Sequence, residues 1–408
     1  MPDGTAYPIN PDVPAHVPPD RVRDFDVYQP SAPGTDYFAG LARLRAEAPP
    51  IFWTRHNGGH WVATDANLVR EMLRDSDRFS SHTLVVPRAN NPPGRGFVPI
   101  HLDPPEHTQY RAHLSLALSR KQVHEMADGI RSFTIGLIED LRPLGECDFV
   151  ADFAFHMPIR VFLRLVDLPE EHRLGLLAEV SKMIHPGGDK AATVKHLMDY
   201  LAPVVAARRA NPGEDLISWL SVREVDGARM NEADLLSMCT LLLIGGLDSV
   251  ANTLGFIARF LADNPAHRHR LIEEPAIISR AVEELLRRFP TVQAGAGREV
   301  VHDTELGGIQ LKAGDVVMAP TSMVNFGALD YDNPLEVDFD RQVPALGTFG
   351  HGPHKCPGAN LARTEITIFL QEWLKRIPEF SVKPGETVEF VSGVNISYAS
   401  LPLVWSVD

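Results

Sequence analysis

Apolar residues recur three and four positions apart through most of the stretch between residues 120 and 275, and this spacing predicts amphipathic helices. Proline and glycine clusters separate the clearest segments, which are 123–142, 153–166, 174–183 and 193–209. The longest helix is expected to start at Asn231 and run to about residue 263, and another covers 276–289. The pattern therefore predicts a predominantly helical chain.

The N-terminal third mixes helical and strand-like segments. Helices are expected over 36–47 and 67–75, with Asp65 as the cap of the second. Residues 51–54 and 60–64 predict a hairpin around an Asn-Gly-Gly turn. The proline, glycine and asparagine content of residues 80–100 predicts a long loop, which leads into a helix opened by Asp-Pro-Pro-Glu at 103–106.

After residue 290 the pattern changes to short strand-like runs, at 299–302, 309–311, 316–319 and in 390–407. The proline-rich residues 1–30 read as an extended arm. No internal repeat or clean linker interrupts the rest. We expect a mainly α (α+β) fold, with one large helical domain over 31–408 and a minor β region.

Composition narrows the class of protein. The 408 residues are 44% hydrophobic and carry a net charge of −14, which disfavours nucleic acid as a partner. Three cysteines, an odd number, indicate a reducing compartment without a disulfide framework. The purest apolar run, 239–247, is far shorter than the roughly 20 residues of a membrane helix, and no signal peptide is recognisable. A soluble, cytoplasmic protein is expected, without membrane association.

Residues 349–358 read Phe-Gly-His-Gly-Pro-His-Lys-Cys-Pro-Gly, and the helical pattern that follows would place a helix N-terminus beside Cys356, favouring its thiolate. A lone cysteine is usually a buried, inert residue. This loop is unlike a packing site, and a zinc site would need partners such as Cys-x-x-Cys. A nucleophile with a distant histidine and an axial thiolate on a haem iron both remain open.

The loop resembles the haem-binding signature of cytochromes P450, Phe-x-x-Gly-x-(His or Arg)-x-Cys-x-Gly. The matching residues are Phe349, Gly352, His354, Cys356 and Gly358. The resemblance implies a haem b cofactor with Cys356 as the iron ligand. It also implies cofactor contacts from Phe349, Gly350 and Gly358.

Gly245 and Gly246 lie within the longest predicted helix, where each glycine costs about 1 kcal/mol relative to alanine. Taken alone, they indicate close helix packing beside a capping Asp248. The run 245–249 also resembles the oxygen-activating motif of the same family, (Ala or Gly)-Gly-x-(Asp or Glu)-(Thr or Ser). That resemblance implies Gly245 at the haem and Asp248 and Ser249 as catalytic proton-relay residues. Serine keeps the hydroxyl of the usual threonine but not its stiffening methyl.

Charged residues match further family positions. Glu284 and Arg287 fit a Glu-x-x-Arg pair, which alone would be an ordinary surface ion pair; the resemblance implies a structural role, buttressed by Arg341. Haem propionates need cationic partners. The family supplies them at positions that match His107, Arg111, Arg298 and His354.

The resemblance narrows to the bacterial camphor-hydroxylase type, most clearly over 371–378 and 401–405. The camphor enzyme has a substrate-binding tyrosine where this chain has Arg95 or Gly96, which disfavours camphor itself. A monoterpenoid or norisoprenoid, small and apolar, is expected instead. The candidate pocket residues are Phe97, Leu241, Ile244, Val394 and Asn395.

The resemblance implies a monooxygenase that uses O2 and electrons from a [2Fe-2S] ferredoxin with its reductase. Its docking face would include Arg70, Arg111, Lys355 and Arg363. Two alternatives are a peroxide-driven peroxygenase, which would not need the Asp248–Ser249 relay, and a non-catalytic haem-thiolate sensor or carrier.

Overall fold

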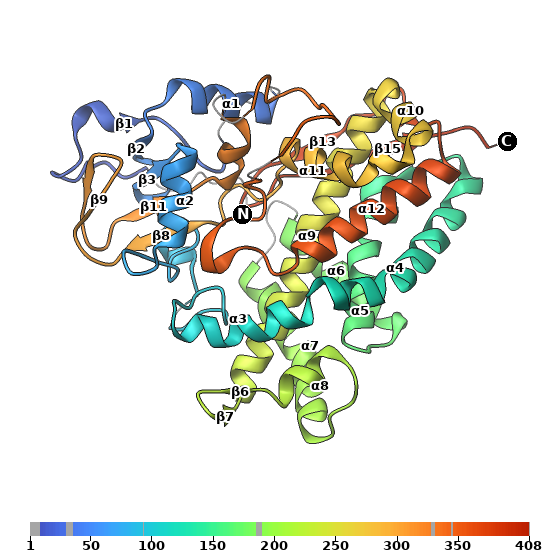
Figure 1. The fold of residues 1–408 in the computed structure, drawn as a ribbon, viewed down its shortest axis with the longest axis horizontal. Coiled ribbons are helices and arrows are strands. Elements are labelled where there is room, and N and C mark those ends of the chain that lie inside the picture. Colours follow the sequence, from blue (N-terminus) through green and yellow to red (C-terminus); the bar gives the residue numbers. More distant parts are fainter. Residues whose placement is uncertain are drawn as a thin grey trace.

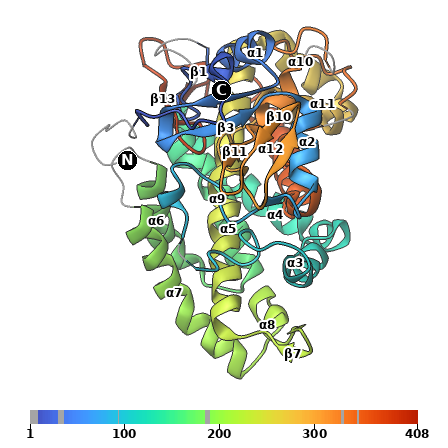
Figure 2. The same cartoon turned by 90° about the vertical axis from the view of Figure 1, so that its left-hand side faces the viewer.

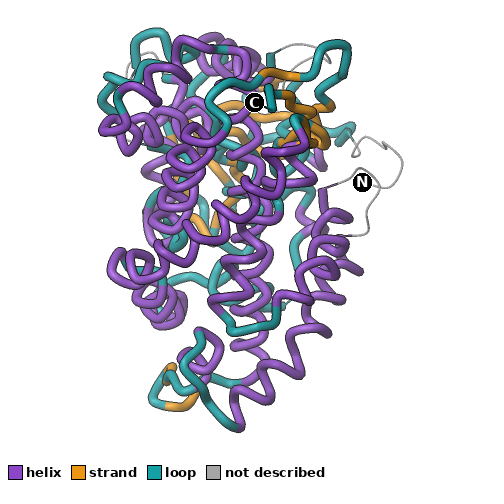
Figure 3. Tube along the Cα trace, turned by 90° about the vertical axis from the view of Figure 1, so that its right-hand side faces the viewer, coloured by secondary structure: helices purple, strands orange, loops and turns teal. Residues whose placement is uncertain are grey.

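The computed structural model describes residues 9–29, 36–92, 94–184, 190–327, 331–343 and 346–407. Most strands gather on one side and long helices fill the centre and the other side (Figures 1 and 3). This arrangement is the mainly helical fold with a minor β region that the hydrophobic pattern predicts.

A six-stranded sheet carries the N-terminal part, in the order β1-β2-β3-β11-β8-β4. Its strands are β1 (Val22–Arg23), β2 (Ile51–Thr54), β3 (His60–Ala63), β4 (Phe79–Ser80), β8 (Gly297–Val300) and β11 (Val316–Met318). The predicted hairpin is present as β2 and β3, with Trp53 opposite Trp61. Within the predicted arm, β1 pairs parallel to β2 and extends the sheet. Residues 1–8 and 30 of that arm lie outside the described residues.

Four smaller sheets complete the β structure. They pair β6 (Glu224–Val225) with β7 (Ala228–Arg229), β9 (Thr304–Leu306) with β10 (Ile309–Leu311), β13 (Glu389–Val391) with β14 (Ser397–Ser400), and β12 (Ser381–Val382) with β15 (Pro402–Val404) and β5 (Glu146–Asp148).

The helices begin where the sequence offers caps. Asp36 accepts from the backbone N–H groups of the first turn of α1, Asp65 does so for α2, and Asn231 accepts from the Asp234 N–H at the start of α9. The helices are α1 (Tyr37–Glu47), α2 (Ala66–Arg74), α3 (Glu106–Ala117), α4 (Arg120–Leu141), α5 (His156–Leu165), α6 (Arg173–Ile184), α7 (Lys190–Ala210), α8 (Leu216–Ser221), α9 (Glu232–Asp263), α10 (Pro265–Glu273), α11 (Ile278–Arg288) and α12 (Ala359–Arg376).

The 32-residue helix α9 runs lengthwise through the molecule, and Figure 2 shows it between the sheet region and the tip formed by α8 and β7. It contacts α5, α7, α8, α10 and α12. By length and composition alone α9 could cross a membrane, but 59% of its most apolar window is buried inside the protein. The helix is therefore built as a core element of this fold.

Three segments differ from the sequence prediction. The helix expected at 153–166 starts as a π-helix, Phe149–Ala154, because Asp148 caps that turn, and continues as α5. The helix expected from 276 begins as a 3₁₀ turn, Pro275–Ile277, before α11. Strand β8 starts two residues before the expected run because Gly297 pairs with Met318 of β11.

Candidate active site

The cysteine loop is held against the C-terminus of α2. Gly352 has φ of +71°, and a Cβ there would lie 2.0 Å from the Leu73 carbonyl oxygen, so only glycine fits. The Cys356 N–H donates to the Phe349 carbonyl at 2.8 Å, which closes the loop. Gly350 adopts a positive φ of +67° in the turn between them.

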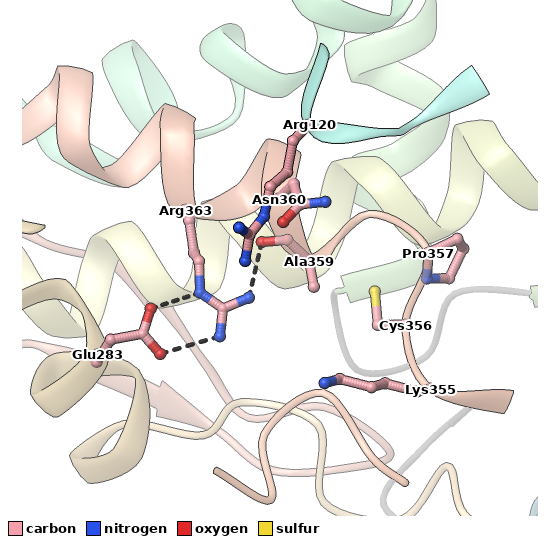
Figure 4. Close-up of a pocket in the computed structure, with 8 residues that line it drawn as sticks. All are labelled: Arg120, Glu283, Lys355, Cys356, Pro357, Ala359, Asn360 and Arg363. Carbon is pink, nitrogen blue, oxygen red and sulfur yellow. Dashed lines mark hydrogen bonds and ion pairs between the residues drawn. The ribbon is translucent and has the colours of Figure 1, made fainter. Parts of the chain in front are cut away.

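Cys356 is an exposed residue at a pocket of about 460 Å³ (Figure 4). The pocket is lined by Arg120, Glu283, Lys355, Cys356, Pro357, Ala359, Asn360 and Arg363. Protein nevertheless surrounds the thiol, and this burial raises the pKa of Cys356. The backbone N–H groups of Gly358 and Ala359 and the charges of Arg111 and Arg363 oppose that rise. The same groups would favour a thiolate bound to a metal cation.

The remaining loop residues support this arrangement. The Arg363 guanidinium lies 4.6 Å from the centre of the Phe349 ring. It also donates to the Glu283 carboxylate at 2.9 Å, and dashed lines mark this ion pair in Figure 4. A Cβ on Gly358, at the start of α12, would lie 3.8 Å from the Cys356 Sγ. Any side chain at position 358 would therefore contact the sulfur.

The four predicted propionate contacts come from distant segments and lie close to one another. His107 is 1% exposed, and its ring centre lies 4.0 Å from that of His354. Arg298, 4% exposed, donates to its neighbour's carbonyl, and no carboxylate in the described ranges pairs with it. Arg111 donates to the Lys355 carbonyl and to Ser115 Oγ.

These side chains form a buried cationic cluster. Burial and the charges of Arg111 and Arg298 lower the pKa of His107 to about 4, and burial with Arg298 lowers that of His354 to about 2. Burial lowers the pKa of Arg298 to about 10, partly offset by Asp103. At neutral pH the positive charge therefore comes from Arg298 and Arg111, while the two imidazoles are neutral and each can donate one N–H. Buried positive charge beside such donors favours an anionic ligand.

His107 gives a second reason to expect a ligand here. Both of its ring nitrogens are buried with no hydrogen-bond partner among the described residues, an uncommon state for a buried polar side chain. A rigid group with two carboxylates would balance the positive charge of the cluster and accept a hydrogen bond from the His107 ring. The cluster therefore fits the propionates of a haem.

His101 was not among the predicted site residues. It is buried, its Nδ1 accepts from the Phe97 N–H at 3.1 Å, and burial lowers its pKa to about 4. The positive charge of Arg298 also lowers that pKa, which places His101 at the cationic cluster. Its only sequence signal was the position ahead of the Asp-Pro-Pro-Glu turn, which is too weak to identify it.

The middle of α9 offers room where the rest of the helix is packed. Gly245 and Gly246 are exposed, and an added Cβ at either would meet nothing within 4 Å, leaving out the helix's own backbone. The two glycines thus keep this face open to a bound group. Ser249 Oγ donates to the Gly245 carbonyl at 3.1 Å, so the hydroxyl lies beside the open face.

Asp248 is held by amide side chains. Its Oδ1 accepts from Asn252 Nδ2 at 2.5 Å, and its Oδ2 accepts from Asn395 Nδ2 at 2.6 Å. Asn395, predicted as a pocket-wall residue, thus reaches the predicted proton relay. The structure brings these three residues together from α9 and the segment before β14.

The other predicted pocket residues are all partly exposed. On α9, Leu241 lies one turn before Gly245 and Ile244 immediately before it, while Val394 precedes Asn395. The ring centre of Phe97 lies 6.2 Å from that of His101. The contact of these residues with a substrate stays a prediction.

Arg95 takes part in a network at the start of α9. It pairs with Glu106 and donates to the Asp234 carboxylate at 3.4 Å, and Tyr110 donates to the same carboxylate at 2.5 Å. The guanidinium therefore binds protein carboxylates. Next to it, the Val98 N–H donates to Ser237 Oγ at 2.9 Å. These contacts fasten the end of the long loop to α3 and α9.

Glu284 and Arg287 are fully buried and form a two-bond ion pair, with N···O distances of 2.7 and 2.8 Å. Arg287 also donates to the carbonyls of Asn325, Pro334 and Glu336, and Arg341 donates to Glu284 Oε1 at 3.1 Å. The predicted trio is thus one satisfied polar network.

The predicted docking residues collect around the cysteine loop. Arg70 and Lys355 both lower the pKa of His351, which burial brings to about 4. Arg111 reaches the Lys355 carbonyl, and Arg363 lines the same pocket as Lys355. Arg120 also lines that pocket, although the sequence offered no reason to select it. Arg363 is neutralised by Glu283, so it adds less to the local field.

Known proteins match the chain over nearly its whole length. The family model described as cytochrome P450 matches residues 169–396. The protein named "Probable cytochrome P450 127A1" from Sinorhizobium fredii is 33% identical over 406 residues, covering 97% of each chain. The crystal structure of CYP101J2 has a TM-score of 0.89 at 39% identity, covering 97% of this chain and 99% of its own. That of CYP101C1 has a TM-score of 0.88 at 37% identity, covering 97% and 100%. The chain therefore belongs to the cytochrome P450 family, a family of monooxygenases whose haem iron is bound by a cysteine thiolate.

Proposed function

We propose that this monooxygenase hydroxylates a small, compact, apolar molecule, and that Cys356 would bind the iron of its haem. The observation that carries the assignment is the buried cationic cluster around His107, which fits propionates close to the cysteine loop. When bound, the haem supplies O2 activation and C–H oxidation. His107, Arg111, Arg298 and His354 would hold its propionates.

Asp248 and Ser249 would carry the proton chemistry. The Ser249 hydroxyl lies at the open face of α9. A hydroxyl can accept one hydrogen bond and donate another, so it can pass a proton along. The Asp248 carboxylate, one residue earlier, can relay protons from solvent. A peroxide-driven peroxygenase would need neither group, which favours the O2-dependent reaction over that alternative.

The substrate class follows from the candidate pocket. Phe97, Leu241, Ile244 and Val394 are apolar, and Arg95 is engaged with Asp234 and Glu106. A substrate therefore gains little from a polar substituent near residue 95 and is selected by shape. A monoterpenoid or norisoprenoid meets these requirements. Camphor itself is disfavoured, because this chain lacks the tyrosine that donates to the camphor ketone in the camphor enzyme.

Redox partner proteins serve this family, and we infer a [2Fe-2S] ferredoxin with its reductase, in the cytoplasm. Basic side chains surround the cysteine loop on a chain whose net charge is −14. An acidic ferredoxin would be drawn to this face because local positive potential guides encounter.

The test is a comparison of three conditions on the purified holoenzyme: a ferredoxin system with O2, hydrogen peroxide alone, and neither. A terpenoid panel is first screened for the shift of the haem spectrum from low spin to high spin. Product from a responding terpenoid only with the ferredoxin system is the expected result. Product with peroxide alone would support the peroxygenase, and binding without product in every condition would support the sensor or carrier.

A further inference from the structure

Asn395 lies in a short segment that joins the candidate pocket wall to the proton relay. Its backbone forms a bridge with Val292, and the carbonyl of Val394 accepts from Gln293 and Ala294 N–H groups at 2.9 and 3.1 Å. On the other side, the Ile396 N–H donates to the Thr291 carbonyl at 2.9 Å. The backbone alone therefore fixes this segment, independently of the side chain at 395.

The Asn395 amide adds a side-chain contact to these backbone bonds. Its Nδ2 donates to Asp248 Oδ2 at 2.6 Å, while Asn252 donates to Oδ1 from one turn along α9. The two amides donate to different oxygens of the Asp248 carboxylate and so fix its plane. They differ in origin, because Asn252 lies on the same helix as Asp248 whereas Asn395 arrives from the pocket wall.

We propose that Asn395 is a positioning residue that couples occupancy of the substrate pocket to proton delivery by Asp248. The inference rests on the proposed roles of Asp248 and of the pocket wall. Because the backbone here is fixed, a substrate packed against Val394 would act on the Asn395 side chain, limiting its rotation and so the distance between its amide and Asp248 Oδ2. Proton exchange at Oδ2 requires that oxygen to be accessible, so the amide governs when it takes place.

Asn395→Leu tests this proposal, because leucine has a similar volume and no amide. The variant should keep its haem content, and its turnover is measured at a terpenoid concentration that saturates the spin-shift titration, so that any change in affinity does not enter the comparison. Product formed per electron pair should fall, with peroxide released in its place, by about 10- to 100-fold, the worth of one hydrogen bond to a charged group. The solvent isotope effect on turnover should change.

A control comes from the same hairpin. Ser392, whose hydroxyl donates to the Tyr28 carbonyl, makes no contact with Asp248 in the described structure, so Ser392→Ala should couple electrons to product like wild type. Asn252→Ala removes the helix-borne amide and should also uncouple the enzyme. Its effect should be the same for well-fitting and poorly fitting terpenoids, whereas that of Asn395→Leu should vary with the fit.

A second readout does not depend on activity. In the substrate-free holoenzyme, Asn395→Leu should lower the melting temperature in the wild-type background and have no such effect when Asp248 is already alanine. Equal shifts in both backgrounds, or wild-type coupling in Asn395→Leu, would overturn the inference. Asp248→Asn distinguishes failure of the proposed relay from failure of this inference. If both Asp248→Asn and Asn395→Leu couple electrons to product like wild type, the relay role of Asp248 is wrong. If only Asp248→Asn uncouples, the relay stands and only the role of Asn395 is wrong.

Discussion

At the scale of single residues, the haem site is defined by buried polar side chains whose bonding within the described residues is incomplete. His107 has two buried nitrogens without hydrogen bonds, and Arg298 is buried with no carboxylate in the described ranges paired to it. Both residues could be selected from the sequence because each falls at a family position. His101 could not, because its place beside Arg298 depends on how the long loop folds back.

His107→Phe should weaken haem retention, because phenylalanine fills the site and offers no donor to a propionate. A hydrogen bond to a charged group is worth about 1.5–3 kcal/mol, so haem loss should be about 10- to 100-fold faster. Transfer of haem to an excess of a haem-free globin measures the rate. His124→Phe, at an exposed position on α4, is the matched control and should retain haem like wild type. Equal retention in both variants would remove His107 from the site.

At the scale of elements, α9 could be predicted almost to its ends, because its cap and its apolar run are local signals. The contacts of the long loop with α9 could not. Arg95 pairs with Asp234, 139 positions away, and periodicity carries no information about such a contact. The short strands β1 and β4 escaped prediction for a related reason, since two residues show no alternation.

Arg95→Met should loosen the end of the long loop, because it keeps the side-chain length and removes both ion pairs. Amide hydrogen exchange over 94–102 should accelerate in the substrate-free enzyme, while exchange in α4 stays unchanged. Substrate should also dissociate faster, since this loop carries Phe97 of the candidate pocket. Wild-type exchange over 94–102 would show that Val98 and Ser237 hold the loop without Arg95.

Two adjacent glutamates on α11 allow a matched comparison. Glu284→Gln leaves Arg287 fully buried without its counter-charge, which should cost about 3–5 kcal/mol of unfolding free energy. Glu283→Gln breaks an ion pair that is about one-third exposed and should cost at most about 1 kcal/mol. Melting temperatures of the two holoenzymes, with their haem contents, test the difference. Similar losses would contradict a special role for the buried pair.

At the scale of the whole molecule, the net charge is negative, whereas the surface around the cysteine loop carries several basic side chains. The net charge of −14 describes the chain, yet Arg70, Arg111, Arg120 and Lys355 gather at the cysteine loop. Three of these four were predicted from matching positions, but their proximity arises only from the fold. The neutralising contact between Arg363 and Glu283 likewise depends on two helices that are distant in sequence.

Ferredoxin association should therefore weaken as ionic strength rises, because exposed charges are screened beyond about 8 Å at physiological salt. Arg111→Ala should reduce affinity and first-electron transfer more than Arg363→Ala, whose charge Glu283 already balances. A salt series of both variants and wild type measures this. A flat salt response, or a larger loss for Arg363→Ala, would place the docking face elsewhere.

Ligation by Cys356 is tested most directly by the spectrum of the reduced, haem-loaded protein under carbon monoxide. Cys356→Ser should lose the red-shifted Soret band of thiolate ligation, because serine stays protonated at neutral pH and binds iron poorly. The buried Cys147 and Cys239 provide matched controls, and Cys147→Ser and Cys239→Ser should both keep that band. Retention of the band in Cys356→Ser, or its loss in either control with haem still bound, would contradict the assignment.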